Sequence, residues 1–149
     1  MSSSRNDANS KQEVDVYVDS SVVLRIVLGQ GARLASWPLI DRPIASELIR
    51  VECLRRIDRA RISAQLPDAE VATRRAAILE VLRGFSLVPV TTAILERAAE
   101  PFPTALGSLD AIHLATALLV RDQVEGLSVA THDAELGLAA RAVGFEVEG

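Results

Sequence analysis

Aromatic residues make up only 3% of this chain of 149 residues, whereas hydrophobic residues make up 49%. The core must therefore be built from Leu, Val, Ile and Ala. The scarcity of aromatic rings also argues against a surface on which nucleic-acid bases stack. The length corresponds to about one domain with a single substantial core.

Cysteine and long apolar runs are also scarce. Cys53 has no second cysteine to pair with, which excludes a disulfide framework and a cysteine-rich zinc site, and we expect cytoplasmic residence. No apolar run reaches the about 20 residues that span a bilayer, so we expect no membrane association. Residues 1–13 are polar and lack a signal-peptide core, and we expect them to be a disordered leader before one domain at 14–149.

Lysine occurs once, at Lys11, among 16 basic residues. A P-loop needs a lysine directly after a glycine-rich loop, and the chain has neither such a loop nor a lysine in that setting. A phosphoacceptor receiver domain also normally uses a lysine deep in its sequence. The net charge of −4 argues against a protein that holds nucleic acid mainly through a broad basic surface.

Four acidic residues occupy settings that favour a site over a solvated surface. They are Asp19, Glu52, Asp110 and Asp133. Residues 14–18 predict a strand that stops at Asp19 and is followed by Ser20 and Ser21. Because ligand sites form at the carboxyl ends of strands in open parallel sheets, Asp19 is well placed to hold a metal. The alternative is that Asp19 only caps a helix predicted over 21–28.

Glu52 lies in the segment 44–57, which predicts a helix that Ser46 can cap. An apolar residue precedes Glu52 by four positions, so Glu52 shares the apolar face of this helix. The alternative is a salt bridge from Glu52 to Arg55 or Arg56 on a solvated flank.

Asp110 opens the most hydrophobic predicted helix, residues 108–120, so its side chain looks into the interior of a site. His113 lies one turn further on. It could carry protons, and the alternative is a hydrogen-bonded histidine of the core.

Asp133 follows a strand predicted at 127–130 and the hydroxyl residue Thr131. The order of strand, hydroxyl, acid and helix repeats the arrangement around Asp19. The alternative is that Asp133 is only the N-cap of the final helix.

The rest of the chain alternates between helix patterns and strand patterns. Further helices are predicted at 69–83, 91–100 and 134–143, further strands at 86–90 and 145–147, and an irregular connection at 31–43. Repeated strand and helix units favour an α/β fold with a central parallel sheet and helices on both faces. The separated acids would then converge at one edge of that sheet.

Four segments, in this order, carry a family resemblance: Asp19–Ser21, the helix around Glu52, the run Leu109–Ala115, and Thr131–Asp133 with the small residues and Gly144 after it. Together they resemble PIN-domain ribonucleases of the VapC toxin type, from about Val14 to the end of the chain. Ser20 stands where a threonine is commoner, and His132 fills a variable position. Neither departure removes a metal ligand.

The resemblance implies a three-layer α/β/α PIN fold over 14–149 and a Mg²⁺- or Mn²⁺-dependent endoribonuclease that cleaves RNA with metal-activated water. It implies that the four acids are catalytic and bind the metal, with Asp19 and Asp110 as direct ligands. Ser21 and Thr131 are candidate donors that orient the carboxylates. The resemblance also implies a VapB-like antitoxin as partner, with its C-terminal segment across the active-site groove, and a toxin homodimer.

Two other functions stay open at this point. The chain could be a non-catalytic PIN-like adaptor with vestigial acids. It could also be a small metal-dependent phosphatase, although no second aspartate follows Asp19 by two positions. The densest basic segment, residues 50–61 with five arginines, is either a solvated helix flank or a contact for the RNA backbone.

Overall fold

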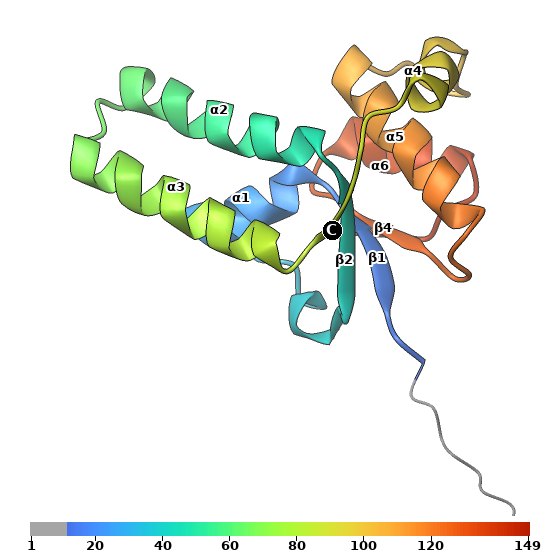
Figure 1. Cartoon of the computed structure of the whole chain (residues 1–149), viewed down its shortest axis with the longest axis horizontal. Coiled ribbons are helices and arrows are strands. Elements are labelled where there is room, and N and C mark those ends of the chain that lie inside the picture. Colours follow the sequence, from blue (N-terminus) through green and yellow to red (C-terminus); the bar gives the residue numbers. More distant parts are fainter. Residues whose placement is uncertain (1–11) are drawn as a thin grey trace, which may run out of the picture.

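The chain alternates strands and helices around one parallel sheet (Figure 1). The computed structural model describes residues 12–149, so most of the predicted leader at 1–13 lies outside the described residues. The strands are β1 (Asp15–Val18), β2 (Arg42–Ser46), β3 (Ser86–Val88), β4 (Ser128–Ala130) and β5 (Val147–Glu148). The helices are α1 (Ser20–Leu28), α2 (Leu48–Ser63), α3 (Asp68–Arg83), α4 (Thr92–Ala99), α5 (Ser108–Arg121) and α6 (Ala134–Ala142). Across residues 12–149, none of the helices combines the length and apolar character that a bilayer crossing requires.

The strands pair in the order β3-β2-β1-β4-β5, and every pairing is parallel. The chain first runs from β1 outward to β2 and β3, and it later returns to the other side of β1 to form β4 and β5. The order therefore reverses between β1 and β4. An open parallel sheet leaves a crevice for ligands at such a point, at the carboxyl ends of its strands.

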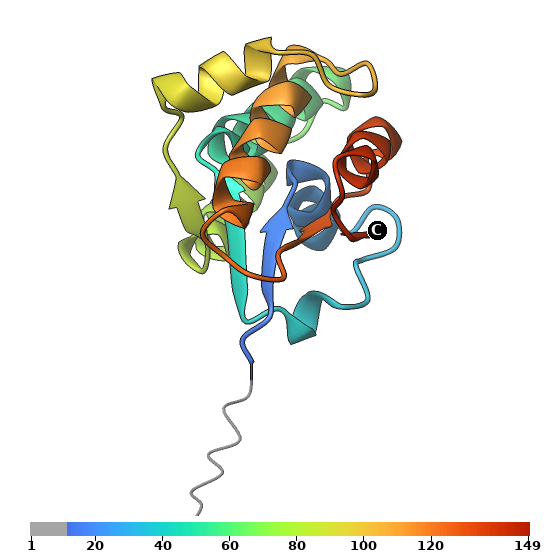
Figure 2. The ribbon, with the colours of Figure 1, turned by 90° about the vertical axis from the view of Figure 1, so that its right-hand side faces the viewer.

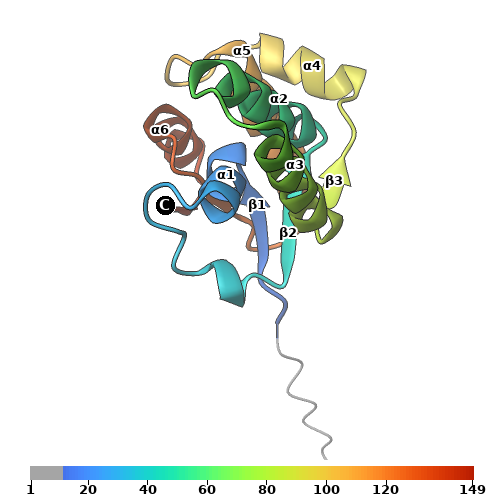
Figure 3. The same ribbon diagram turned by 90° about the vertical axis from the view of Figure 1, so that its left-hand side faces the viewer.

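Helices cover both faces of the sheet. Figure 2 looks at the side of α5 and α6, and Figure 3 looks at the side of α1 and α3. Strand β1 supplies both cores, because successive side chains of a strand point to opposite faces. Val16 and Val18 pack with α1, α2 and α3, whereas Tyr17 packs with α5 and α6. The predicted three-layer α/β/α fold is confirmed.

The turn from β1 into α1 follows the prediction closely. The helix expected over 21–28 begins one residue earlier, at Ser20, and ends where Gly29 adopts the left-handed conformation with φ of 65°. The N–H of Gly29 donates to the carbonyl of Arg25 at 3.0 Å and closes the last turn. Helix α1 therefore has a fixed start beside Asp19 and a fixed end.

The helix that Ser46 was expected to cap begins at Leu48, but the strand β2 over residues 42–46 was not predicted. A five-residue strand that contains Pro43 has no period that separates it from the following helix. The sheet accepts Pro43 because the pairing of β2 with β3 begins only at the next residue, Ile44. The irregular connection predicted over 31–43 is correspondingly shorter.

The last predicted strand, 145–147, is displaced toward the C-terminus. Strand β5 consists of Val147–Glu148, and Phe145 is buried in the core on the α5 and α6 side instead. The apolar side chain of Phe145 is therefore used for packing rather than for strand pairing.

Replacing Gly29 with Ala should lower the free energy of unfolding by about 1 kcal/mol, since a Cβ is strained at its positive φ. Gly84→Ala is the matched control: Gly84 also ends a helix, but its φ is −79°. The control should be neutral or slightly stabilising. Urea denaturation measures both variants, and equal losses in the two would contradict a role for the left-handed conformation.

Candidate active site

All four predicted acids line one pocket, which we call the acidic pocket, near the point where the strand order reverses. Asp19 follows β1, Glu52 lies on α2, Asp110 lies in the first turn of α5, and Asp133 starts α6. The other lining residues are Ser20, Ser21, Leu24, Arg25, Leu28, Gln30 and Arg56. The fold thus gathers acids that lie far apart in the sequence.

Asp19 is 3% exposed, and its Oδ2 accepts hydrogen bonds from two hydroxyl groups. Ser21 Oγ donates at 2.7 Å and Thr131 Oγ1 donates at 2.9 Å. The backbone N–H of Ser21, which is the helix-capping donor, is 3.4 Å away. Because hydrogen bonds weaken with distance, the hydroxyls hold this carboxylate more firmly than the cap does.

The two hydroxyl groups are themselves fixed by the connection from β4 to α6. The backbone N–H of His132 donates to Ser21 Oγ at 2.9 Å, and that of Asp133 donates to Thr131 Oγ1 at 3.0 Å. Each hydroxyl oxygen therefore accepts from the backbone and directs its proton to Asp19. Both residues predicted as orienting donors thus contact the carboxylate directly.

Asp133 is the N-cap of α6, as the alternative for this residue predicted. Its Oδ1 accepts from the backbone N–H of Glu135 at 2.9 Å and from that of Leu136 at 3.1 Å. Both bonds fall on Oδ1, so Oδ2 is not used by the cap. Helix capping and a place in the acidic pocket are therefore compatible for Asp133.

Glu52 turns toward the interior, and within residues 12–149 it forms no ion pair with an arginine of α2. Arg55, one of the two predicted partners, instead pairs with Asp58 at 3.3 Å. The partner of Glu52 is His113 on α5, whose Nε2 contacts Glu52 Oε1. The alternative of a solvated salt bridge for Glu52 is wrong.

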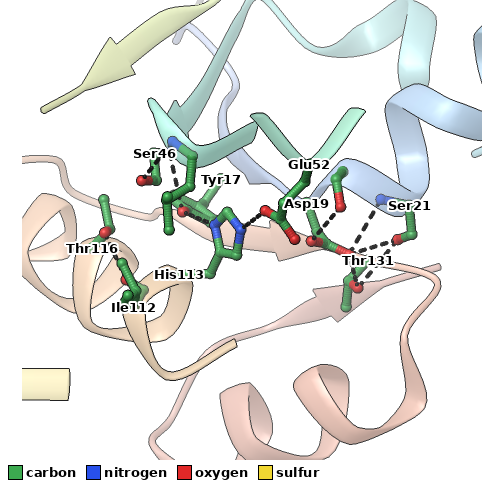
Figure 4. A network of polar contacts seen from close by, with 11 residues as sticks. Tyr17, Asp19, Ser21, Ser46, Glu52, Ile112, His113, Thr116 and Thr131 are labelled. Carbon is green, nitrogen blue, oxygen red and sulfur yellow. Dashed lines mark hydrogen bonds and ion pairs between the residues drawn. The ribbon is translucent and has the colours of Figure 1, made fainter. Parts of the chain in front are cut away.

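His113 is fully buried and has a polar partner on each ring nitrogen (Figure 4). Its Nδ1 lies 2.8 Å from Tyr17 Oη, which accepts the backbone N–H of Ser46 at 3.1 Å. Burial lowers the pKa of His113, but the hydrogen bond to Glu52 and nearby carboxylate charges outweigh burial and raise the pKa above its ordinary value. The expectation of a hydrogen-bonded core histidine is confirmed.

The sequence reasoning missed Tyr17 and Ser46 as partners of this histidine. One signal was available, because a tyrosine inside an apolar strand is buried and a buried phenol needs a hydrogen-bond partner. Burial also raises the pKa of Tyr17, so its hydroxyl stays protonated. Ser46 ends β2, and its side chain accepts from Leu48 N–H at 3.2 Å, at the start of the helix that it was expected to cap.

The basic segment of α2 divides between ion pairs and the pocket. Arg55 and Arg61 pair with aspartates of α2 and α3, whereas Arg56 lines the acidic pocket. The solvated-flank alternative therefore holds for part of the segment only. Arg25 and Gln30, which also line the pocket, were missed by the sequence reasoning.

Asp110 carries the clearest electrostatic sign of crowding. Burial, and after it the charges of Asp133 and Asp19, raise the pKa of the Asp110 carboxyl to about 6. Like charges at close range disfavour the ionised form of each group. The acids thus repel one another across the pocket.

The donor set suits a hard divalent cation, because every acid offers carboxylate oxygens. Mg²⁺ and Mn²⁺ prefer such oxygens, and Mg²⁺ keeps several of its waters. Within the part of the chain that the structure describes, no three acid, histidine or cysteine side chains already form a ready-made metal-binding group. A cation in the acidic pocket would therefore be held partly through water.

Residues 16–142 match the PIN domain family, and the chain belongs to this family. The chain is also 26% identical, over 132 residues, to Ribonuclease VapC47 of Mycobacterium tuberculosis. That match covers 87% of this chain and 93% of the relative. The residues matched to the family include all four acids.

Solved structures share the fold at low identity. A chain of a toxin-antitoxin complex from Klebsiella pneumoniae has a TM-score of 0.59 at 19% identity. The match covers 85% of this chain and 93% of the matched chain. VapBC2 from Rickettsia felis, bound to a DNA fragment from its promoter, has a TM-score of 0.64 at 7% identity. The match covers 91% of this chain and 100% of the matched chain. PAE2754 from Pyrobaculum aerophilum has a TM-score of 0.59 at 20% identity, and the match covers 90% of this chain and 89% of the matched chain.

In metal-free protein, Asp110→Asn should stabilise the fold by about 1 kcal/mol at pH 7, a value reduced for the solvent screening of a half-buried group. The pKa of Asp110 is about 6 when folded and about 3.9 when unfolded. The folded state binds the extra proton between these values, so wild-type stability falls as the pH rises from about 4 to about 6. The advantage of the variant should grow as the pH rises from about 4 through the folded pKa of about 6, and it should be complete by about pH 7.

Urea titrations in chelator from pH 4 to pH 7 measure this difference. Asp122→Asn, at the other end of α5 and outside the acidic pocket, is the control. A stability difference between Asp110→Asn and wild type that stays constant over this pH range would contradict repulsion among the acids.

Proposed function

We propose that the chain is a divalent-cation-dependent endoribonuclease of the VapC toxin type, acting in a toxin-antitoxin pair. The observation that carries the proposal is the convergence of four acids on one pocket of a PIN fold. The similarity to a protein named Ribonuclease VapC47 supports RNA as the substrate. The proposal includes residence in the cytoplasm.

The residues of the acidic pocket divide the work in this proposal. Asp19 and Asp110 bind Mg²⁺ or Mn²⁺ directly, and Glu52 and Asp133 bind it directly or through water. When bound, the cation lowers the pKa of a water molecule and stabilises charge on the phosphoryl group during hydrolysis. The two hydroxyls on Asp19 keep its Oδ2 in one orientation, so the carboxylate does not need to be ordered when the cation enters.

Arg56 supports the binding of a polyanion beside these acids. It lies one helical turn from Glu52 and lines the same pocket. A guanidinium group there can pair with a phosphate of the RNA backbone while the cation neutralises the acids. The acidic pocket and a negative net charge are thus compatible with an RNA substrate.

The phosphatase alternative has less support. The second aspartate expected two positions after a nucleophilic aspartate is absent, because Ser21 stands there and its hydroxyl binds Asp19 Oδ2. A non-catalytic adaptor would have the same fold and the same acids, so only an assay of RNA cleavage distinguishes it from the nuclease. The phosphatase and adaptor alternatives both predict no RNA cleavage.

Asp110→Asn should lower RNA cleavage by at least about 100-fold, because the loss of even a supporting partner of a metal site typically costs 10–100-fold. Wild-type cleavage should require Mg²⁺ or Mn²⁺ and stop in chelator. Cleavage of structured RNA, single-stranded DNA and a phosphate monoester should be measured on the same preparations, with circular dichroism as a check of folding.

Asp122→Asn is the matched control and should cleave RNA at the wild-type rate. Half of the wild-type activity in a folded Asp110→Asn protein would remove Asp110 from the proposed role. Hydrolysis of the monoester without cleavage of RNA would favour the phosphatase.

The proposed partner is a VapB-like antitoxin whose C-terminal segment crosses the acidic pocket and places an arginine against the acids. The planar guanidinium group pairs bidentately with carboxylates, so it can replace the cation. The proposed toxin assembly is a homodimer.

Expression of the wild-type chain should arrest bacterial growth, and co-expression of the VapB-like protein encoded beside it should restore growth. Asp110→Asn should not arrest growth, although it should still bind the antitoxin. Harmless expression of a wild-type chain that also fails to cleave RNA in vitro would favour the adaptor.

A further inference from the structure

A chain of hydrogen bonds runs from the sheet to one acid of the pocket (Figure 4). The backbone N–H of Ser46, at the end of β2, donates to Tyr17 Oη of β1 at 3.1 Å, and this oxygen lies 2.8 Å from His113 Nδ1 on α5. His113 Nε2 then contacts Glu52 Oε1 on α2. These hydrogen bonds thus link four elements and end at one carboxylate.

The direction of these bonds follows from the protons available. A carboxylate only accepts hydrogen bonds, so the N–H of the contact with Glu52 lies on His113 Nε2. In the neutral imidazole, which has one N–H, Nδ1 then accepts the proton of Tyr17 Oη, while Tyr17 Oη accepts the N–H of Ser46. A doubly protonated ring also carries this N–H, so Glu52 receives a donor in either form.

We propose that His113 is a positioning residue that holds Glu52 in the orientation in which Glu52 serves the cation of the acidic pocket. This inference rests on the proposed metal-dependent nuclease and adds to it a residue that touches neither the cation nor the RNA. The bond occupies Oε1 of Glu52. Its other oxygen, Oε2, lies on the side of Asp19 in Figure 4 and is left for the cation or one of its waters.

The position of the pair at the boundary between core and pocket supports this role. His113 is 0% exposed, whereas the Glu52 side chain is 20% exposed. A purely structural histidine can satisfy both nitrogens inside the core, as Nδ1 does with Tyr17. Here Nε2 instead restrains a long side chain with several rotatable bonds at the pocket wall. Hydrogen bonds of this kind orient the carboxylates of metal sites.

Two amide substitutions separate the two bonds of His113. In His113→Asn the short amide can reach Tyr17 but not Glu52, and in His113→Gln the longer amide can donate to Glu52. The Kd for Mn²⁺ should rise about 10–100-fold in His113→Asn and stay closer to wild type in His113→Gln. Electron paramagnetic resonance of free Mn²⁺ measures Kd without any RNA or catalysis.

Two controls separate positioning from stability. Leu114→Ala removes a buried apolar side chain of the same helix, so it should lower the melting temperature and leave the Mn²⁺ Kd unchanged. In a Glu52→Gln background, His113→Asn should have no further effect on Kd. Both controls are measured well below the melting temperature of each variant.

The outcomes distinguish this inference from the proposed function. Wild-type binding of Mn²⁺ together with an unchanged Kd in His113→Asn would overturn the positioning role and leave the metal site intact. Failure of the wild type to bind Mn²⁺ would overturn the metal site and this inference with it.

Tyr17→Phe decides the question if neither histidine variant folds. Phe removes the hydrogen-bond partner of His113 Nδ1, so the ring that restrains Glu52 is held less firmly. The Mn²⁺ Kd should then rise above the wild-type value. An unchanged Kd in Tyr17→Phe would overturn the role of the hydrogen-bonded chain.

Discussion

The two hydroxyl hydrogen bonds on Asp19 Oδ2 are the contacts on which the geometry of the pocket depends. They join the start of α1, through Ser21, to the end of β4, through Thr131, across the point where the strand order reverses. Each hydroxyl is also anchored by a backbone N–H of the connection into α6. Backbone pairing brings β1 and β4 together, and this one buried oxygen then fixes Ser21 and Thr131 and, through them, the connection that carries Asp133, the cap of α6.

This arrangement keeps negative charges close together, against their mutual repulsion. Burial, and after it the charges of neighbouring acids, raise the pKa of Asp110. A ligand that brings positive charge to the folded pocket relieves the repulsion and stabilises the fold by mass action. A divalent cation and an arginine of an antitoxin both have this property. The same electrostatic cost would therefore favour both the proposed cation and the proposed inhibitor, and the two would compete for the pocket.

Local patterns were sufficient to predict most of the fold and the positions of the acids. The strand, hydroxyl and acid order around Asp19 and Asp133 predicted two carboxylates at strand ends, and both lie in the acidic pocket. Strand β2 could not be predicted, because it is short and contains Pro43, and its pairing partners lie elsewhere in the chain.

The partner of Glu52 was unpredictable for a related reason. The contact between Glu52 and His113 joins residues 61 positions apart, and its existence depends on how α2 and α5 pack. The sequence carries the chemistry of each residue, whereas the pairing of residues comes from packing.

The central claim is that the acids gathered by this packing form one cation site. It is tested most directly by a crystal structure of the protein grown with Mn²⁺, with diffraction measured at a wavelength where Mn²⁺ scatters anomalously. The account predicts an anomalous peak in the acidic pocket, at about 2.1 Å from an oxygen of Asp19 or Asp110. A pocket with no such peak, or a peak bound only by residues outside the four acids, would contradict it.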